Sequence, residues 1–169
     1  IQVFFQVSSS YAAPVPIVFS ATVTTLSQDP QPANNQDSVA TTFVEPPRPL
    51  GFYTVTPCRL YDSRTPGELP LSAGEDRVVW PHAAGCGVPY GARALALNVT
   101  VADPSTMGNV RVYAAYSPLP NVSVVNYTAG QTRASNVVAG LSPDGGLAVR
   151  ASQASGTVHV VLDVVGYFE

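Results

Sequence analysis

Lysine is absent from this chain, and all eight basic residues are arginines. A chain without lysine cannot form a Schiff base with a carbonyl substrate, and it cannot supply the phosphate-binding lysine of a P-loop. It also cannot form the lysine–asparagine isopeptide bond that cross-links some surface pilins. The lack of lysine thus excludes several chemistries before any motif is considered.

Charge is scarce as well: 11% of residues are charged, against about 25% in typical soluble domains. The net charge is −3, and the arginines are scattered singly rather than gathered in a patch. Binding to nucleic acid or to an anionic membrane surface normally depends on such a patch. No run approaches the ~20 apolar residues of a membrane-spanning helix. We therefore expect neither nucleic-acid binding nor membrane insertion.

Helical periodicity is also missing, because no stretch of ten or more residues repeats apolar positions at helical spacing. The chain is instead 46% hydrophobic, with much Val, Thr and Ser, 13 glycines and 16 prolines. This mixture favours short strands joined by tight turns over helices. The sequence predicts an all-β protein.

The only two cysteines are Cys58 and Cys86, and they do not form a C-x-x-C motif. An even, minimal count in a β-rich chain is typical of one disulfide in an exported protein. The alternative is a pair of free buried thiols in a cytosolic domain. No signal peptide is visible and the chain starts at Ile1, so we expect an extracellular or cell-surface protein whose leader has been removed.

Prolines divide the chain into two predicted parts. Residues 46–51 hold three prolines within four positions, which favours a semi-rigid spacer over a central strand. Residues 1–45 precede this linker and residues 52–169 follow it. The first part contains three strand-like runs, at Ile1–Ser8, Pro16–Leu26 and Asp37–Val44.

The second part holds a longer series of short strand candidates separated by turn clusters, which predicts a β-sandwich or jelly-roll-like domain. The candidates are Phe52–Thr56, Arg77–Trp80, Ala92–Val101, Gly108–Ala115, Val122–Tyr127, Ala134–Gly140, Leu147–Ala151 and Thr157–Phe168. The last run is apolar on both faces and is expected at the centre of a sheet. Its acid, Asp163, is then expected to be buried and paired with Arg59 or Arg64.

Five motifs of this second part resemble an uncharacterised extracellular domain of bacteria, found on secreted and surface proteins of actinobacteria and myxobacteria. They are Pro57–Arg64 (PCRLYDSR), Cys86–Pro89, Ala94–Thr100, Asn126–Gly130 and His159–Phe168, which ends in DVVGYF. The family pattern is PCRLxDTR near the start and DVxGYF at the end; Ser63 stands where threonine is commoner. The resemblance implies export and a β fold, and it implies no established activity.

Residues 16–45 resemble the end of an Ig-like repeat that recurs in tandem in prokaryotic surface proteins, through Phe19–Thr24 and Asp29–Asn35. A whole sandwich of this kind needs roughly seven strands and about 100 residues, so this part predicts a partial Ig-like sheet. The leading hypothesis is that a neighbouring copy completes it by strand addition, giving a head-to-tail homopolymer in a filament or surface layer. The expected contact residues are Ile1, Val3, Phe5 and Val7, with Phe19 and Val23 facing them.

The second hypothesis is a non-catalytic module of a larger secreted protein that binds cell-surface glycan. Sugar rings stack on aromatic side chains, and packing in the core is the alternative role for such residues. The candidate platform consists of Trp80, Tyr90, Tyr113 and Tyr116, with Tyr127 as a further member.

Catalysis and metal binding have little support in the sequence. Only His82 and His159 exist, no G-x-S-x-G motif is present, and His159 and Asp163 are about 13 Å apart along one strand. No pair of acids stands out for glycoside hydrolysis. Calcium binding by Asp29, Asn34, Asn35 and Asp37 competes with the ordinary role of these residues in turns. We expect no catalytic residue, no cofactor and no metal site.

Overall fold

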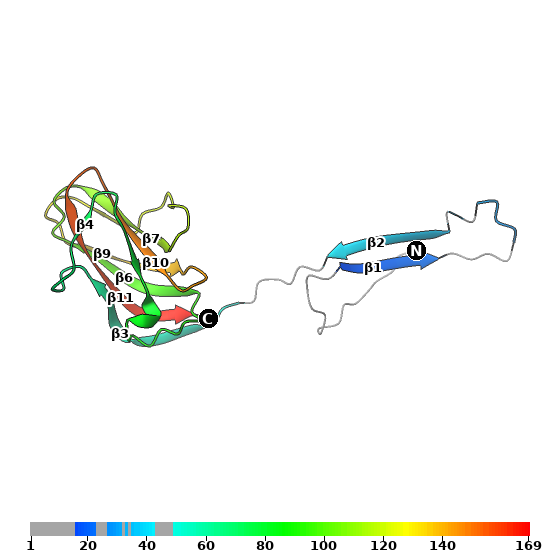
Figure 1. Cartoon of the computed structure of the whole chain (residues 1–169), viewed down its shortest axis with the longest axis horizontal. Helices are drawn as coiled ribbons and strands as arrows, with labels where there is room; N and C mark the ends of the chain where they lie inside the picture. The colour runs from blue at the N-terminus through cyan, green and yellow to red at the C-terminus, as the bar shows by residue number, and fades with distance from the viewer. Residues whose placement is uncertain (1–15, 23–26, 32, 34, 43–48) are drawn as a thin grey trace. The chain divides into compact units, whose positions relative to one another are not determined.

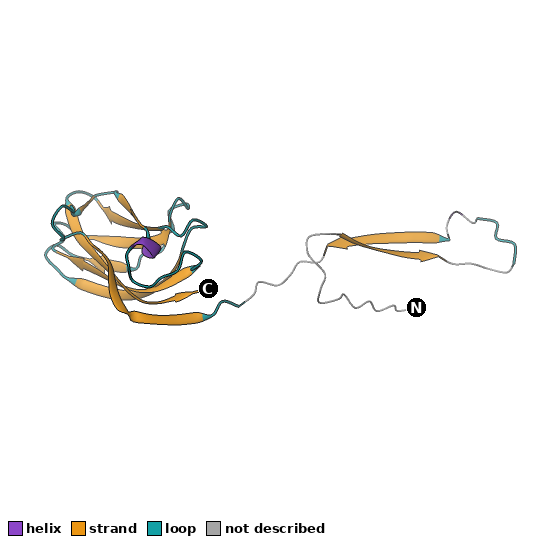
Figure 2. Cartoon of the chain, turned by 60° about the horizontal axis from the view of Figure 1, so that its bottom comes forward, coloured by secondary structure: helices purple, strands orange, loops and turns teal. Residues whose placement is uncertain are grey.

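The computed structural model describes residues 16–22, 27–31, 33, 35–42 and 49–169. The chain divides into two compact units, Ile1–Pro49 and Leu50–Glu169. The division falls inside the proline-rich segment. The described residues are almost entirely strands and turns, with one short 3₁₀ helix in the second unit (Figure 2). The predicted all-β class is confirmed.

The described residues of the first unit include an antiparallel pair of strands, β1 (Pro16–Thr22) and β2 (Gln36–Thr42). The two strands are in continuous register from Pro16 opposite Thr42 to Thr22 opposite Gln36. In the loop between them, the carboxylate of Asp29 accepts hydrogen bonds from the backbone N–H of Gln31 and from Asn35 Nδ2. These two bonds are typical of an Asx residue that stabilises a turn.

The second unit is a sandwich of two antiparallel sheets (Figure 1). One sheet has the order β5-β10-β7-β8, and the other has the order β3-β11-β6-β9, with β4 also pairing with β11. The strands are β3 (Phe52–Asp62), β4 (Leu71–Ser72), β5 (Asp76–Val79), β6 (Ala94–Ala102), β7 (Gly108–Ala114), β8 (Val125–Tyr127), β9 (Arg133–Gly140), β10 (Leu147–Gln153) and β11 (Thr157–Phe168).

Alternating side chains of the two sheets form a single core. In β6, every second residue from Leu95 to Val101 is buried, as expected when one face of a strand packs inward. β11 lies between β6 on one side and β3 and β4 on the other, in the central position that its apolar sequence predicts. Together with residues of β7 and β10, these strands supply most of the fully buried side chains.

The predicted disulfide between Cys58 and Cys86 is confirmed. It joins β3 to the loop after the 3₁₀ helix, across a Cα–Cα distance of 5.6 Å and a sequence separation of 28 residues. A cross-link of this length stabilises a fold by about 3 kcal/mol, mainly by restricting the unfolded chain.

Candidate functional site

A cluster of exposed aromatic rings forms at one end of the sandwich, around the 3₁₀ helix η2 (Pro81–Ala83). Trp80 directly follows β5 and precedes Pro81, and a residue before proline is held in an extended conformation. Pro81 is buried and begins the helical turn, which Ala83 closes with a backbone hydrogen bond to Trp80 O at 3.0 Å. The Trp80 ring is therefore placed by a rigid backbone.

His82 lies between two larger rings. Its ring centroid is 6.1 Å from that of Trp80 and 5.0 Å from that of Tyr90, and both contacts are edge-on, with interplanar angles of 68° and 73°. The three rings form an angled surface rather than a flat one. His82 is itself exposed, and nothing in the local sequence shows that Tyr90 returns to it.

The turn between β9 and β10 packs beneath these rings. The hydroxyl of the buried Ser142 accepts a hydrogen bond from the backbone N–H of Gly146 at 2.9 Å and bonds to Asp144. A side chain at Gly146 would come within 3.1 Å of Trp80 Cζ3, and Gly145 adopts a positive φ of 84° beside His82. Only glycine satisfies both conditions, so the Asp-Gly-Gly sequence allows the turn to approach the aromatic rings.

The predicted glycan platform is only partly assembled. Trp80 and Tyr90 remain 37% and 64% exposed and meet at His82, while Tyr116 is 77% exposed in the loop after β7. That loop is bonded to the same turn, since Ala115 N–H donates to Gly146 O at 3.1 Å.

Two of the predicted tyrosines have other roles. Tyr113 lies within β7, where its hydroxyl donates to Asp76 Oδ1 at 2.6 Å. Tyr127 is only 4% exposed and donates to Gln153 Oε1 at 2.6 Å. Tyr127 is buried because it lies on the inward face of β8. Tyr113 alternates with the buried Val112 and stays half-buried on the outer face of its sheet, where Asp76 holds its hydroxyl.

The PCRLYDSR segment forms an ion-pair network rather than a reactive site. Asp62 accepts hydrogen bonds from Arg64 Nε and Nη2, at 2.8 and 2.7 Å, and from Arg59 Nη1 at 3.0 Å. Arg59 Nε also donates to Asp163 Oδ1 at 2.9 Å. The hydrogen bonds from the Arg64 guanidinium hold the pKa of Asp62 well below its usual range.

Asp163 therefore pairs with Arg59, whereas Arg64 pairs with Asp62. The expectation of a buried ion pair is wrong, because the side chains of Arg59 and Asp163 are 51% and 26% exposed. Asp163 lies between the buried residues Leu162 and Val164, so its side chain points to the outer face of the sheet. Water and Arg59 both reach it there.

The structure brings Ser63 and His159 together, a pair that sequence reasoning missed. Ser63 Oγ lies 3.0 Å from His159 Nδ1 and accepts a hydrogen bond from Val160 N–H at 2.9 Å. Ser63 has no exposed surface, so no substrate reaches its hydroxyl. The pair fixes the end of β3 against β11 instead of forming a nucleophile and base.

The residues of the strand-addition hypothesis cannot be placed. Ile1, Val3, Phe5, Val7 and Val23 lie outside the described residues. Phe19 lies in β1, opposite Val39, and its side chain is not among those described.

Among the described residues, no group of three or more histidine, cysteine, aspartate or glutamate side chains is arranged to hold a metal ion. Within them, no helix has the length and apolar character needed to cross a bilayer.

No family model matches the chain, and no curated protein matches it. The family resemblances of the two parts therefore stay predictions.

Proposed function

We propose that this protein is a non-catalytic surface module, secreted by a bacterium, that binds glycan at the aromatic end of its sandwich. The observation that carries the proposal is the set of exposed Trp80 and Tyr90 rings, both in contact with His82. Rings held in place by η2 and the Ser142–Gly146 turn lose little side-chain freedom when a ligand binds, and this preorganisation favours affinity.

The chemistry of the site suits a neutral sugar. The apolar face of a pyranose packs on an aromatic ring, while its hydroxyls need a few fixed polar groups nearby. Asp144 and His82 supply such groups beside the rings. The disulfide supports an extracellular location, since such bonds persist in oxidising compartments.

The test is calorimetric titration of the full chain with fragments of bacterial cell-wall glycan. We expect Tyr90→Ala to weaken binding about tenfold through loss of ring stacking. Tyr53→Ala removes another half-exposed tyrosine, from β3, and is the matched control. The proposal fails if no cell-wall glycan binds, or if the two variants bind equally.

Self-assembly by strand addition is the second candidate, and the β1–β2 pair favours it. Two antiparallel strands alone are marginally stable in water, and pairing with a further strand stabilises them. The proposed partner is a strand formed by the Ile1–Ser8 segment of a neighbouring copy. In this model the protein is a subunit of an extracellular filament or surface layer.

Negative-stain microscopy and size-exclusion chromatography of the full chain test this model. Long regular assemblies are expected, and Phe5→Glu should disperse them, because a charge inside a β interface is costly. Val122→Glu, at a 70% exposed position of the second unit, is the control and should leave assemblies intact. A monomer at all concentrations would contradict the model.

A further inference from the structure

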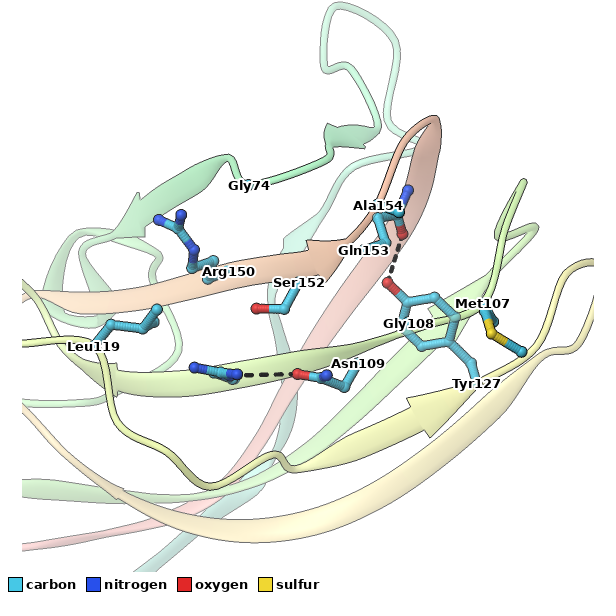
Figure 3. A pocket seen from close by; sticks show the side chains of 11 residues that line it. Gly74, Met107, Gly108, Asn109, Leu119, Tyr127, Arg150, Ser152, Gln153 and Ala154 are labelled. Atoms are coloured by element: carbon cyan, nitrogen blue, oxygen red, sulfur yellow. Dashed lines mark hydrogen bonds between the residues drawn. The ribbon is translucent and has the colours of Figure 1, made fainter.

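An open groove of about 700 Å³ crosses the outer face of the four-stranded sheet, over the start of β7 and the end of β10 (Figure 3). Gly108 lies at its base, where a side chain would come within 2.9 Å of the Tyr127 hydroxyl and closer still to β10. Met107 and Leu119 form part of its lining and are 70% and 41% exposed.

The groove is basic although the whole chain is acidic. Its only charged lining residues are Arg111 and Arg150, while the net charge of the chain is −3. The two arginines are register partners on neighbouring strands, so their side chains lie on the same face. Like charges directly opposite each other destabilise a sheet unless a counter-charge lies nearby.

The two arginines differ in their partners. Arg150 Nη1 is neutralised by Asp76 Oδ2 at 2.6 Å. Arg111 has only neutral partners among the described residues: Pro120 O at 2.9 Å from Nη1 and Asn109 Oδ1 at 3.4 Å from Nε. A guanidinium carries five N–H donors in a fixed fork, so Arg111 keeps donors for a ligand. The two existing bonds also hold the fork in place.

Neutral hydrogen-bonding side chains share the groove with this guanidinium. Asn109, Ser152 and Gln153 line the same groove, and Gln153 is oriented by its bond from Tyr127. Amides and hydroxyls at this density suit a ligand that is itself rich in hydroxyls, with one acidic group for Arg111.

We propose that this groove binds a carboxylate-bearing sugar chain, a uronic acid polymer, with Arg111 holding the carboxylate. An extended peptide is disfavoured because peptides usually add to a sheet through a free strand edge. At this groove neither strand has a free edge. Gly108–Val110 of β7 pair with β10 on one side and with β8 on the other. β10 is bonded to β7 on one side, and to β5, Gly74 and Glu75 on the other. Side chains alone must recognise the ligand.

The groove is separate from the aromatic end. It covers the start of β7 and the end of β10, whereas Tyr116 and the Ser142–Gly146 turn lie at the end of β7 and the start of β10. The proposal thus does not depend on glycan binding at Trp80 and Tyr90.

The experiment titrates the full chain with pentamers of galacturonic acid, with pentamers of galactose, and with a poly-glutamate of equal charge, at low and moderate salt. We expect the acidic pentamer to bind more tightly than the other two, with affinity that falls as salt rises. Arg111→Gln should weaken that binding by tenfold or more, since it removes charge-assisted hydrogen bonds.

Arg93→Gln is the matched control, because Arg93 is exposed and lies outside the groove. Its substitution changes the net charge by the same amount as Arg111→Gln. It should bind within twofold of the parent chain, as should Tyr90→Ala. Circular dichroism and melting temperature verify that each variant is folded. The proposal is overturned if the acidic pentamer does not bind, if Arg111→Gln and Arg93→Gln bind alike, or if poly-glutamate binds as tightly as the sugar.

Discussion

At the scale of single residues, the hydroxyl of Ser63 connects two strands that are far apart in sequence. It has no exposed surface and contacts both His159 Nδ1 and Val160 N–H. Ser63 N–H also donates to Val160 O at 3.0 Å, so this residue continues the β3–β11 ladder beyond Asp62. Polar groups buried in this way are costly to leave unpaired.

Replacement of Ser63 by alanine is expected to lower the free energy of unfolding by about 1–3 kcal/mol, because the buried Val160 N–H loses the hydroxyl oxygen to which it donates. Guanidinium chloride unfolding followed by fluorescence measures the change. Ser123→Ala, which removes an exposed serine hydroxyl, should stay within about 0.5 kcal/mol of the parent. Equal effects of the two substitutions would show that the Ser63 contacts do not stabilise the fold.

Three tyrosines make the stability of the fold depend on pH in the alkaline range. Burial raises the pKa of Tyr61, of Tyr113 and of Tyr127 to about 12. For Tyr113, the hydrogen bond to Asp76 adds to the effect of burial. In each case the folded state favours the neutral phenol over the phenolate. The resulting stabilisation is fully present below pH 10, the pKa of about 10 being that of tyrosine in the unfolded chain, and it is lost as the pH rises toward 12.

Absorbance at 295 nm should therefore show three tyrosines ionising about two pH units above free tyrosine, together with a fall in melting temperature between pH 10 and 12. Tyr127→Phe should remove one late phenol and reduce the alkaline loss. If no tyrosine ionises later than free tyrosine while the chain remains folded, the environments described for these three are wrong.

At the scale of the secondary-structure elements, the sequence predicts most of the second unit. Alternation of apolar residues locates β6, β7 and β10, because each of these strands has one face in the core. β11 is located by its long run of residues that is apolar on both faces. β3 is predicted to end at Thr56, since proline rarely enters a central strand. In the structure β3 runs to Asp62, and Pro57 is tolerated because β3 is an edge strand at an irregularity in the register with β11.

The remaining elements are missed for physical reasons. β4 has two residues, too few for any periodic pattern, and it exists only because β11 offers it an edge. The aromatic end and the basic groove are long-range features. His82 meets Tyr90 through loop geometry, and Arg111 lies opposite Arg150 only because β7 pairs with β10 in that register.

The register shift in β11 lies next to position 166, where the close approach of β3 requires glycine. A side chain there would come within 2.6 Å of the Phe52 ring and 2.7 Å of Tyr53 O. Gly166→Ala is expected to cost about 1–3 kcal/mol of unfolding free energy through overpacking. Gly140→Ala, in β9, meets nothing within 4 Å and is the matched control. Chemical denaturation of both variants checks the difference, and a neutral Gly166→Ala would contradict the tight approach of β3.

At the scale of the whole molecule, the second unit has its own core and its own disulfide. Such a unit is expected to fold independently of the residues before it. A fragment of residues 50–169 should be monomeric and melt cooperatively, within a few degrees of the matching transition in the full chain. Calorimetry compares the two, and a fragment that is unfolded or much less stable would show that residues 1–49 stabilise the sandwich.

The strands that begin and end this unit also determine how it would respond to mechanical tension. Gly51 and Glu169 exchange two backbone hydrogen bonds, at 2.8 and 3.1 Å, and Phe52 packs against Phe168 just inside them. Antiparallel strands pulled apart from adjacent ends break their bonds one after another, because the force acts along each bond in turn. A load applied between residues 50 and 169 would therefore peel β3 from β11 progressively, and the Cys58–Cys86 bond would stop the peeling partway along β3. A tethered molecule would yield first at its point of attachment while the remainder of the sandwich stays closed.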